Sequence, residues 1–214
     1  MQLSLSSPFF CTRWAQASES VRITATIADA AGIPIQIRML NKGEPLLVGQ
    51  ISDDGNSLST VLAKLLIEPT GSKPMCKHIR NITEQVKEME SNLLGNRTIA
   101  LLTIITDGAS TDGHIIEALK PLEGMPVQIM IRLYTEEEEV LEYWQDVSAH
   151  LDLDIIILRG HKAESHIIAE HNKWLTYGEP MHRLREFGVL IPAVNSLGSR
   201  QLSRREIKTV AQIV

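Results

Sequence analysis

The chain has 214 residues, of which 43% are hydrophobic, 22% are charged and 4% are aromatic. This length and composition fit a globular protein with one large domain and a substantial core, and they exclude disorder as the default. Because 21 Lys and Arg residues face 26 Asp and Glu residues, the net charge is −5. An acidic chain has no electrostatic reason to bind nucleic acid or anionic lipid, so we expect neither partner.

Signals of compartment are sparse. No stretch of about 18 apolar residues is present, so we expect no transmembrane helix. Cys11 and Cys76 are too few for a disulfide framework. The first 18 residues contain no acid, are rich in Ser and include Arg13. This composition has a weak similarity to transit peptides.

Short β-rich runs alternate with longer helical patterns along the chain, which is typical of a parallel sheet with crossover helices. Residues 98–106 are the clearest strand, because their nearly continuous apolar sequence is what burial on both faces requires. The predicted strands are residues 1–5, 33–40, 46–51, 98–106, 126–133 and 154–158. We expect five or six strands in one mostly parallel sheet, in the spatial order 3-2-1-4-5-6.

The helices expected between these strands are marked by apolar spacing or by their ends. Gly32 is expected to end the first helix, and Thr135 to cap a helix whose first turn holds the acidic residues 136–139. The predicted helices are residues 14–31, from Ser57 or Ser59 to Leu66, 75–94, 114–122, 135–150 and 202–213. The chain between the last strand and residue 202 is expected to be irregular.

Three segments resemble the von Willebrand factor A family. The run LLTIITDGASTDG, residues 101–113, resembles the family's third metal-site motif, in which a buried strand ends in Thr-Asp-Gly. Upstream, PTGSKPM, residues 69–75, resembles the Gly-rich second motif. Farther on, WLTYGEPMHRLREFG, residues 174–188, is similar to the closing segment of an intracellular, protist-type branch. The three segments have the family's order and spacing, and the resemblance covers most of the chain.

The resemblance implies a doubly wound, Rossmann-like α/β fold, with a mostly parallel sheet flanked by helices. It implies a domain of residues 1–188 and a C-terminal extension of residues 189–214 that ends in a helix. It also implies an intracellular protein. Because Ile207, Val210 and Ile213 share one face of the terminal helix, we expect that face to pack on the domain or on a partner.

The family binds a divalent ion at the carboxyl ends of the strands. The resemblance implies ligands from an Asp-x-Ser-x-Ser motif after the first strand, the Thr of the second motif and the Asp of the third. These are the hard oxygen ligands that Mg²⁺ prefers. In this chain only Asp107 matches outright. The Asp of the first motif falls on Gln2 or, in a second alignment that makes Ser6 the first serine, on Ser4, and Lys73 stands at the Thr position.

Loss of a carboxylate and gain of an ammonium change this site by about two charge units, so we expect no metal and no other cofactor. Two interpretations of Lys73 stay open. Its ammonium takes the place of the ion and pairs with Asp107, or it points into water from an exposed loop. Ser4, Ser6, Lys73 and Asp107 are therefore the candidate ligand-binding positions of a degenerate metal site.

Other polar patterns favour structure over chemistry. His161, His166 and His171 recur every five residues, a rotation of about 140° per step on a helix, so they do not converge on one ion. Residues 110–112 follow a strand and precede a helix, which explains them as turn and N-cap residues. Neither a nucleophile elbow nor a phosphate-binding loop is present, so we expect no catalytic residue.

These observations favour a non-catalytic domain that binds another protein, as a subunit or scaffold of a multi-subunit complex. A functional, Mg²⁺-dependent ligand-binding domain with an unusual first motif is the alternative. A hydrolase that uses Asp107 and a metal is the less favoured alternative, because the motif losses oppose it.

Overall fold

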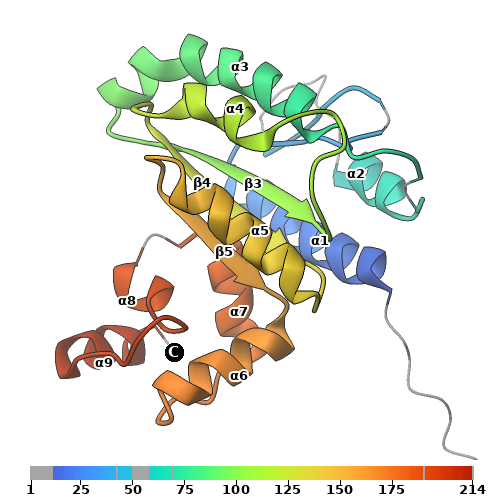
Figure 1. The fold of residues 1–214 in the computed structure, drawn as a ribbon. Coiled ribbons are helices and arrows are strands. Elements are labelled where there is room, and N and C mark those ends of the chain that lie inside the picture. The colour runs from blue at the N-terminus through green and yellow to red at the C-terminus, as the bar shows by residue number, and fades with distance from the viewer. Residues whose placement is uncertain (1–11, 42, 50–57, 69, 190, 214) are drawn as a thin grey trace, which may run out of the picture.

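The computed structural model describes residues 12–41, 43–49, 58–68, 70–189 and 191–213. None of the helices in these ranges combines the length and the hydropathy that a membrane crossing needs. Figure 1 shows the fold. Its elements in chain order are α1 (Arg13–Ala31), β1 (Ile35–Ile37), β2 (Leu46–Val48), α2 (Leu58–Leu65), α3 (Met75–Gly95), β3 (Ala100–Thr106), α4 (Ile115–Leu119), η1 (Lys120–Leu122), β4 (Val127–Leu133), α5 (Glu138–Ala149), β5 (Ile155–Arg159), α6 (His161–His171), α7 (Glu179–Glu186), α8 (Pro192–Asn195) and α9 (Arg204–Ala211).

Three parallel strands form the central sheet, in the order β3-β4-β5 (Figure 1). Ala100 of β3 lies opposite Val127 of β4, and Ile129 of β4 lies opposite Ile155 of β5. All seven residues of the middle strand, β4, are buried. The parallel arrangement predicted for the last three strands is therefore confirmed, together with the mixed α/β class.

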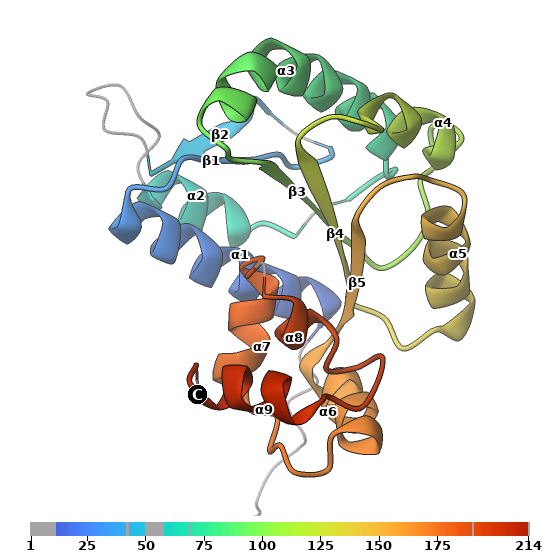
Figure 2. The same ribbon diagram turned by 90° about the vertical axis from the view of Figure 1, so that its left-hand side faces the viewer.

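Helices cover both faces of this sheet. Figure 2 shows α3, α4 and α5 on one face and α1 and α7 on the other. The first face holds the main hydrophobic core, in which Ile129 and Ile131 of β4 join the fully buried Trp144 of α5. Because side chains alternate along a strand, Gln128 and Arg132 of β4 point to the second face, where both are buried. One face of the sheet is thus apolar and the other carries buried polar groups.

The first two observed strands form a separate sheet. β1 and β2 pair antiparallel, with Ile35 opposite Val48 and Ile37 opposite Leu46. Each is three residues long, shorter than predicted. Within the described ranges no strand joins this pair to β3. The strand expected between them, residues 1–5, lies outside the described residues, so the single sheet in the order 3-2-1-4-5-6 stays a prediction.

Two helix ends show where local sequence rules succeed and fail. α1 ends at Gly32 as predicted, in the left-handed conformation with φ of +64°. The helix predicted to begin at the Thr135 cap begins instead at Glu138. The Thr135 hydroxyl accepts a hydrogen bond from the backbone N–H of Glu137 at 3.2 Å, which holds a short turn before the helix. Two acidic residues rather than four therefore occupy the first turn of α5.

The chain after β5 was predicted to be irregular, and this prediction is wrong. The segment contains the helices α6, α7 and α8. The apolar pattern missed α6 and α7 because charged side chains account for much of their burial. His182, Arg185 and Glu186 are buried on α7. On α6, Glu164 is buried beside Ile168. A periodicity that counts only apolar residues does not detect helices of this kind.

A second, smaller hydrophobic cluster unites the C-terminal helices. The terminal helix α9 begins with a capping box between Ser203 and Glu206 and contributes Val210 to the cluster. Its Ile207 is partly buried there, which confirms that the helix packs on the rest of the chain, whereas Ile213 is 36% exposed. The cluster spans the predicted boundary at residue 188, and the division into domain and extension stays a prediction. Its buried members are Ile168, Tyr177, Met181, Ala193, Val194, Leu197, Leu202 and Val210.

Candidate functional site

The candidate site begins at the turn that follows β3. The buried Thr106 hydroxyl accepts a hydrogen bond from the Gly108 N–H at 3.1 Å and donates to the Gly108 carbonyl at 2.9 Å. The same carbonyl accepts a hydrogen bond from Trp144 Nε1 at 3.3 Å. These contacts fix the turn on the main core. They place Asp107, between Thr106 and Gly108, at the carboxyl end of the strand.

Lys73 reaches Asp107 from the loop before α3. Its backbone N–H donates to the Thr111 hydroxyl at 2.8 Å, and the Thr111 N–H donates back to the Lys73 carbonyl at 3.0 Å. This reciprocal pair joins the two loops. The ammonium of Lys73 then donates to Oδ1 of Asp107. Of the two interpretations of Lys73, the structure has the one in which the ammonium pairs with Asp107.

Two further charged side chains extend this pair. Nη1 of Arg13, at the start of α1, lies 3.5 Å from Oδ2 of Asp107. Nη2 of Arg13 lies 2.6 Å from Oε1 of Glu137, the residue before α5. Lys73, Asp107, Arg13 and Glu137 form a row of alternating charges, which we call the charge row. Its side chains are between 36% and 59% exposed, so the row lies on the surface.

The charge row sets the protonation state of its central carboxylate. Partial burial by itself raises the pKa of Asp107, but the hydrogen bond and the charge of Lys73, with help from Arg13, outweigh it and hold the pKa below its ordinary value. Asp107 is therefore an anion at neutral pH. With two cations and two carboxylates, the charge row is electrically neutral.

Asp112, the second acid of the third motif, caps α3. Its two carboxylate oxygens accept hydrogen bonds from the backbone N–H groups of Cys76 and Lys77, each at 2.9 Å. The hydroxyl of Ser110 also donates to Asp112, at 2.6 Å. α3 needs this carboxylate because Pro74 occupies its N-cap position and offers no side-chain acceptor. The cap anchors the loop after β3 to the start of α3.

This cap differs from the predicted one, which belonged to the helix after the loop. That helix, α4, has His114 at its N-cap position without a side-chain hydrogen bond. Desolvation raises the pKa of Asp112, but the donors from Ser110, Lys77 and Cys76 outweigh it and lower the pKa to about 2. The acid is thus committed to a structural role as an anion.

The described residues do not fit the divalent ion that the family resemblance implies. One carboxylate oxygen of Asp107 contacts the ammonium of Lys73, and the other lies near the guanidinium of Arg13. Both positively charged groups would repel a metal cation. In the described ranges, no group of three or more His, Cys, Asp or Glu side chains has the arrangement of a metal site. Ser4 and Ser6 lie outside the described residues, so of the four candidates the structure brings together Lys73 and Asp107.

No motif in the sequence pointed to Arg13 or Glu137 as a member of the site. A usable signal was present for Glu137, because it lies in the connection that leaves the carboxyl end of β4, as Asp107 lies in the one that leaves β3. Residues that follow neighbouring parallel strands meet at the same edge of a sheet. Arg13 gave no such signal, since its position depends on how α1 crosses the sheet.

A second polar cluster lies on the opposite face of the sheet and is fully enclosed. Nη2 of Arg132 on β4 lies 2.7 Å from Oε1 of Glu186 on α7. Nη1 of Arg185 on α7 lies 2.5 Å from Oε2 of Glu164 on α6. These four side chains, between 3% and 6% exposed, form what we call the buried ion-pair network. Each carboxylate has an arginine partner, so the network is a structural connection between the sheet, α6 and α7.

His182 lies beside this network as a neutral side chain. Burial lowers the pKa of His182 to about 4, and the positive charges of Arg183 and Arg185 act in the same direction, although Glu186 opposes them. Its Nδ1 lies 3.1 Å from the hydroxyl of Tyr177. A neutral imidazole can form this hydrogen bond in either tautomer. Tyr177, His182, Arg185 and Glu186 all belong to residues 174–188, the segment that resembles the family's closing segment. Their contacts with the sheet and with α6 give these residues a structural role.

Comparisons of the chain with protein-family models, with curated proteins and with solved structures give no match. The family resemblance therefore rests on the three motifs alone.

Proposed function

We propose that this chain is a non-catalytic, protein-binding domain of the von Willebrand factor A type, in which a lysine takes the place of the metal ion. The observation that carries the proposal is the contact between the Lys73 ammonium and Asp107 at the carboxyl end of β3. This edge is where open α/β sheets bind their ligands. The resemblance implies a cation at this position, and Lys73 supplies one that belongs to the chain.

The charge row supports binding rather than catalysis. Its charges are exposed and alternate in sign, an arrangement that favours one orientation of a complementary partner more than it adds affinity. Nucleophilic catalysis would need a nucleophile with an adjacent base. The Ser110 hydroxyl instead donates to Asp112, which already caps α3, and the Lys73 amine and the Asp107 carboxylate of the row are paired with each other.

The test is the mass of the protein isolated from its native cells, measured by size-exclusion chromatography with light scattering. The proposal predicts a complex heavier than the 23.8 kDa chain. The double variant Lys73→Asp/Asp107→Lys keeps an internal ion pair but reverses its direction, and it is expected to release the partner. The variant Arg205→Glu changes an exposed charge on α9 and serves as the control, which should keep the partner. A monomeric wild-type chain would contradict the proposal.

Chelation separates this proposal from the metal-dependent alternative. If Lys73 replaces the ion, the complex survives an excess of EDTA. If a divalent ion bridges the partner, EDTA dissociates the complex and Mg²⁺ restores it. Hydrolysis of generic ester and phosphate substrates that depends on Asp107 would instead support the hydrolase alternative.

A further inference from the structure

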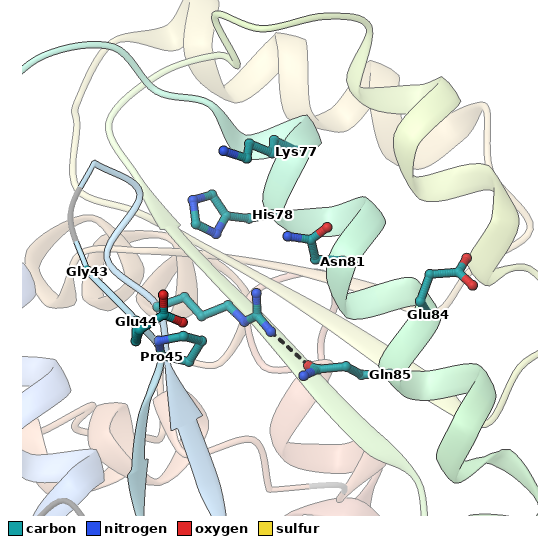
Figure 3. A pocket seen from close by; sticks show the side chains of 9 residues that line it. Gly43, Glu44, Pro45, Lys77, His78, Asn81, Glu84 and Gln85 are labelled. Atoms are coloured by element: carbon teal, nitrogen blue, oxygen red, sulfur yellow. Dashed lines mark hydrogen bonds between the residues drawn. The ribbon is translucent and has the colours of Figure 1, made fainter.

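A cavity of about 540 Å³ lies between the loop before β2 and the outer face of α3 (Figure 3). Arg38 and residues 43–45 contribute one wall. Lys77, Asn81 and Gln85 contribute to the other wall, and their four-residue spacing places them on one face of α3. None of these residues belongs to the charge row. The cavity is therefore a separate feature, and its role does not rest on the proposed function.

Arg38 is held in a fixed position by neutral groups. Its Nε donates to Oε1 of Gln36 at 2.7 Å, and its Nη2 donates to Oε1 of Gln85 at 2.9 Å. The dashed line that ends on Gln85 in Figure 3 marks the second of these contacts. Within the described part of the chain, no carboxylate lies at ion-pair distance from Arg38. The guanidinium is thus oriented in advance, and its charge is not compensated.

Two more donors face the same space. Figure 3 shows Lys77 and Asn81 extending from α3 toward the loop of residues 43–45. Lys77 also has no ion-pair partner among the described residues. Because the Oε1 of Gln85 accepts from Arg38, the amide NH₂ of Gln85 remains available as a further donor. A guanidinium, an ammonium and two amides form a donor set suited to the oxygens of an anion.

The carboxylates on the walls do not cancel this positive charge. Glu84 is paired with Lys87 at 2.7 Å, and its carboxylate points away from Lys77 and Asn81 in Figure 3. Among the described residues that line the cavity, Glu44 is the carboxylate that remains once Glu84 is paired. Arg38 and Lys77 together outweigh it by one charge.

We propose that this cavity binds a small anionic ligand through a phosphate or carboxylate group, with Arg38 as the main contact and Lys77 and Asn81 as supporting donors. A guanidinium presents two parallel N–H groups to such an oxyanion, which gives both charge and orientation. Glu44 opposes the anion, and the affinity therefore depends on the balance between it and the two cations.

Calorimetric titration with inorganic phosphate, and separately with malonate, at constant ionic strength tests the proposal. The wild-type chain is expected to show saturable binding of at least one anion, and the tighter of the two identifies the group. Arg38→Gln is expected to weaken binding about tenfold or more, because it removes a charged hydrogen-bond donor. Arg80→Gln is the matched control, since Arg80 is exposed on α3 and does not line the cavity. It should leave the affinity unchanged.

A change of opposite sign sharpens the test. Glu44→Gln removes the opposing charge and is expected to tighten binding about threefold or more. Lys77→Gln is also expected to weaken anion binding, and it changes an exposed residue. It keeps the test valid if Arg38→Gln destabilises the fold and lowers the thermal midpoint of unfolding. No saturable binding of either anion, or equal weakening by Arg38→Gln and Arg80→Gln, would overturn the proposal. Neither outcome bears on the charge row, so the two proposals fail separately.

Discussion

The ammonium of Lys73 meets the carboxylate of Asp107 at the carboxyl end of β3, the position at which the family resemblance implies a divalent ion. The two side chains are 38% and 36% exposed, so solvent screens much of their attraction. The pair therefore contributes little to folding stability. In the function proposed above, the pair supplies a fixed cation in place of a metal ion.

A double-mutant cycle measures this contribution. Lys73→Met, Asp107→Asn and the combined variant are expected to give a coupling free energy of about 0.2–1 kcal/mol in urea unfolding at neutral pH. Because the folded pKa of Asp107 is lowered, the coupling is present above the ordinary pKa of an aspartate and is lost as the pH falls through the folded value. The surface pair Lys87 and Glu84 gives a comparison. A coupling well above that of the comparison pair would contradict a screened contact.

The cap on α3 should matter more for stability. Asp112→Ala leaves the N–H groups of Cys76 and Lys77 without their acceptor, and is expected to destabilise the fold by about 1–2 kcal/mol. Since the folded pKa is about 2, this stability is present above pH 4 and is lost between about pH 4 and pH 2. Urea unfolding against pH checks both statements. The control variant Asp152→Ala changes an exposed acid and should alter neither the free energy of unfolding nor its dependence on pH. An equal effect of the two variants would contradict the capping role of Asp112.

The buried ion-pair network should tolerate the loss of both partners better than the loss of one. Glu186→Gln leaves the guanidinium of Arg132 buried without its counter-ion, at an expected cost of about 3–5 kcal/mol. The double variant Arg132→Met/Glu186→Leu removes both charges and is expected to be more stable than Glu186→Gln. Urea unfolding of the two variants decides between them. If the double variant is the less stable one, the ion pair itself stabilises the fold.

His182 should make the stability depend on pH in a different window. Its folded pKa of about 4 lies below the ordinary value of 6.5, so the unfolded chain binds the proton more readily. The associated stability is therefore fully present above about pH 6.5 and falls as the pH is lowered toward 4, by about 2–3 kcal/mol. His182→Gln should remove most of this slope, whereas the exposed His166→Gln should keep it. An unchanged slope in His182→Gln would show that the imidazole is not buried in neutral form.

The apolar runs of the sequence were sufficient to predict the parallel strands. Residues 98–106 and 126–133 are each long enough and apolar enough to require burial, and they became β3 and β4. The same runs located Asp107, because it ends the first of them. Whether Lys73 pairs with Asp107 or points into water stayed open, because the sequence does not show where a long lysine side chain points.

Contacts between distant parts of the chain explain what was missed. Asp112 caps a helix whose first residues precede it by 36 positions, so a rule that looks for the cap next to its own helix assigns it wrongly. α6 and α7 were missed because Glu164 and Arg185 are buried as an ion pair. A buried charge looks like a surface residue until its partner is known.

The most direct test of the central claim is a calorimetric titration of the wild-type chain with Mg²⁺. We predict no saturable heat at millimolar concentrations, because the Lys73 ammonium contacts the Asp107 carboxylate and would repel a divalent ion there. Lys73→Thr combined with Ser4→Asp, or with Gln2→Asp for the other alignment, restores the carboxylate and the hydroxyl that the resemblance implies, and one of the two double variants is expected to bind Mg²⁺ measurably. Saturable binding by the wild-type chain that Asp107→Asn abolishes would contradict the claim and favour a metal-dependent domain.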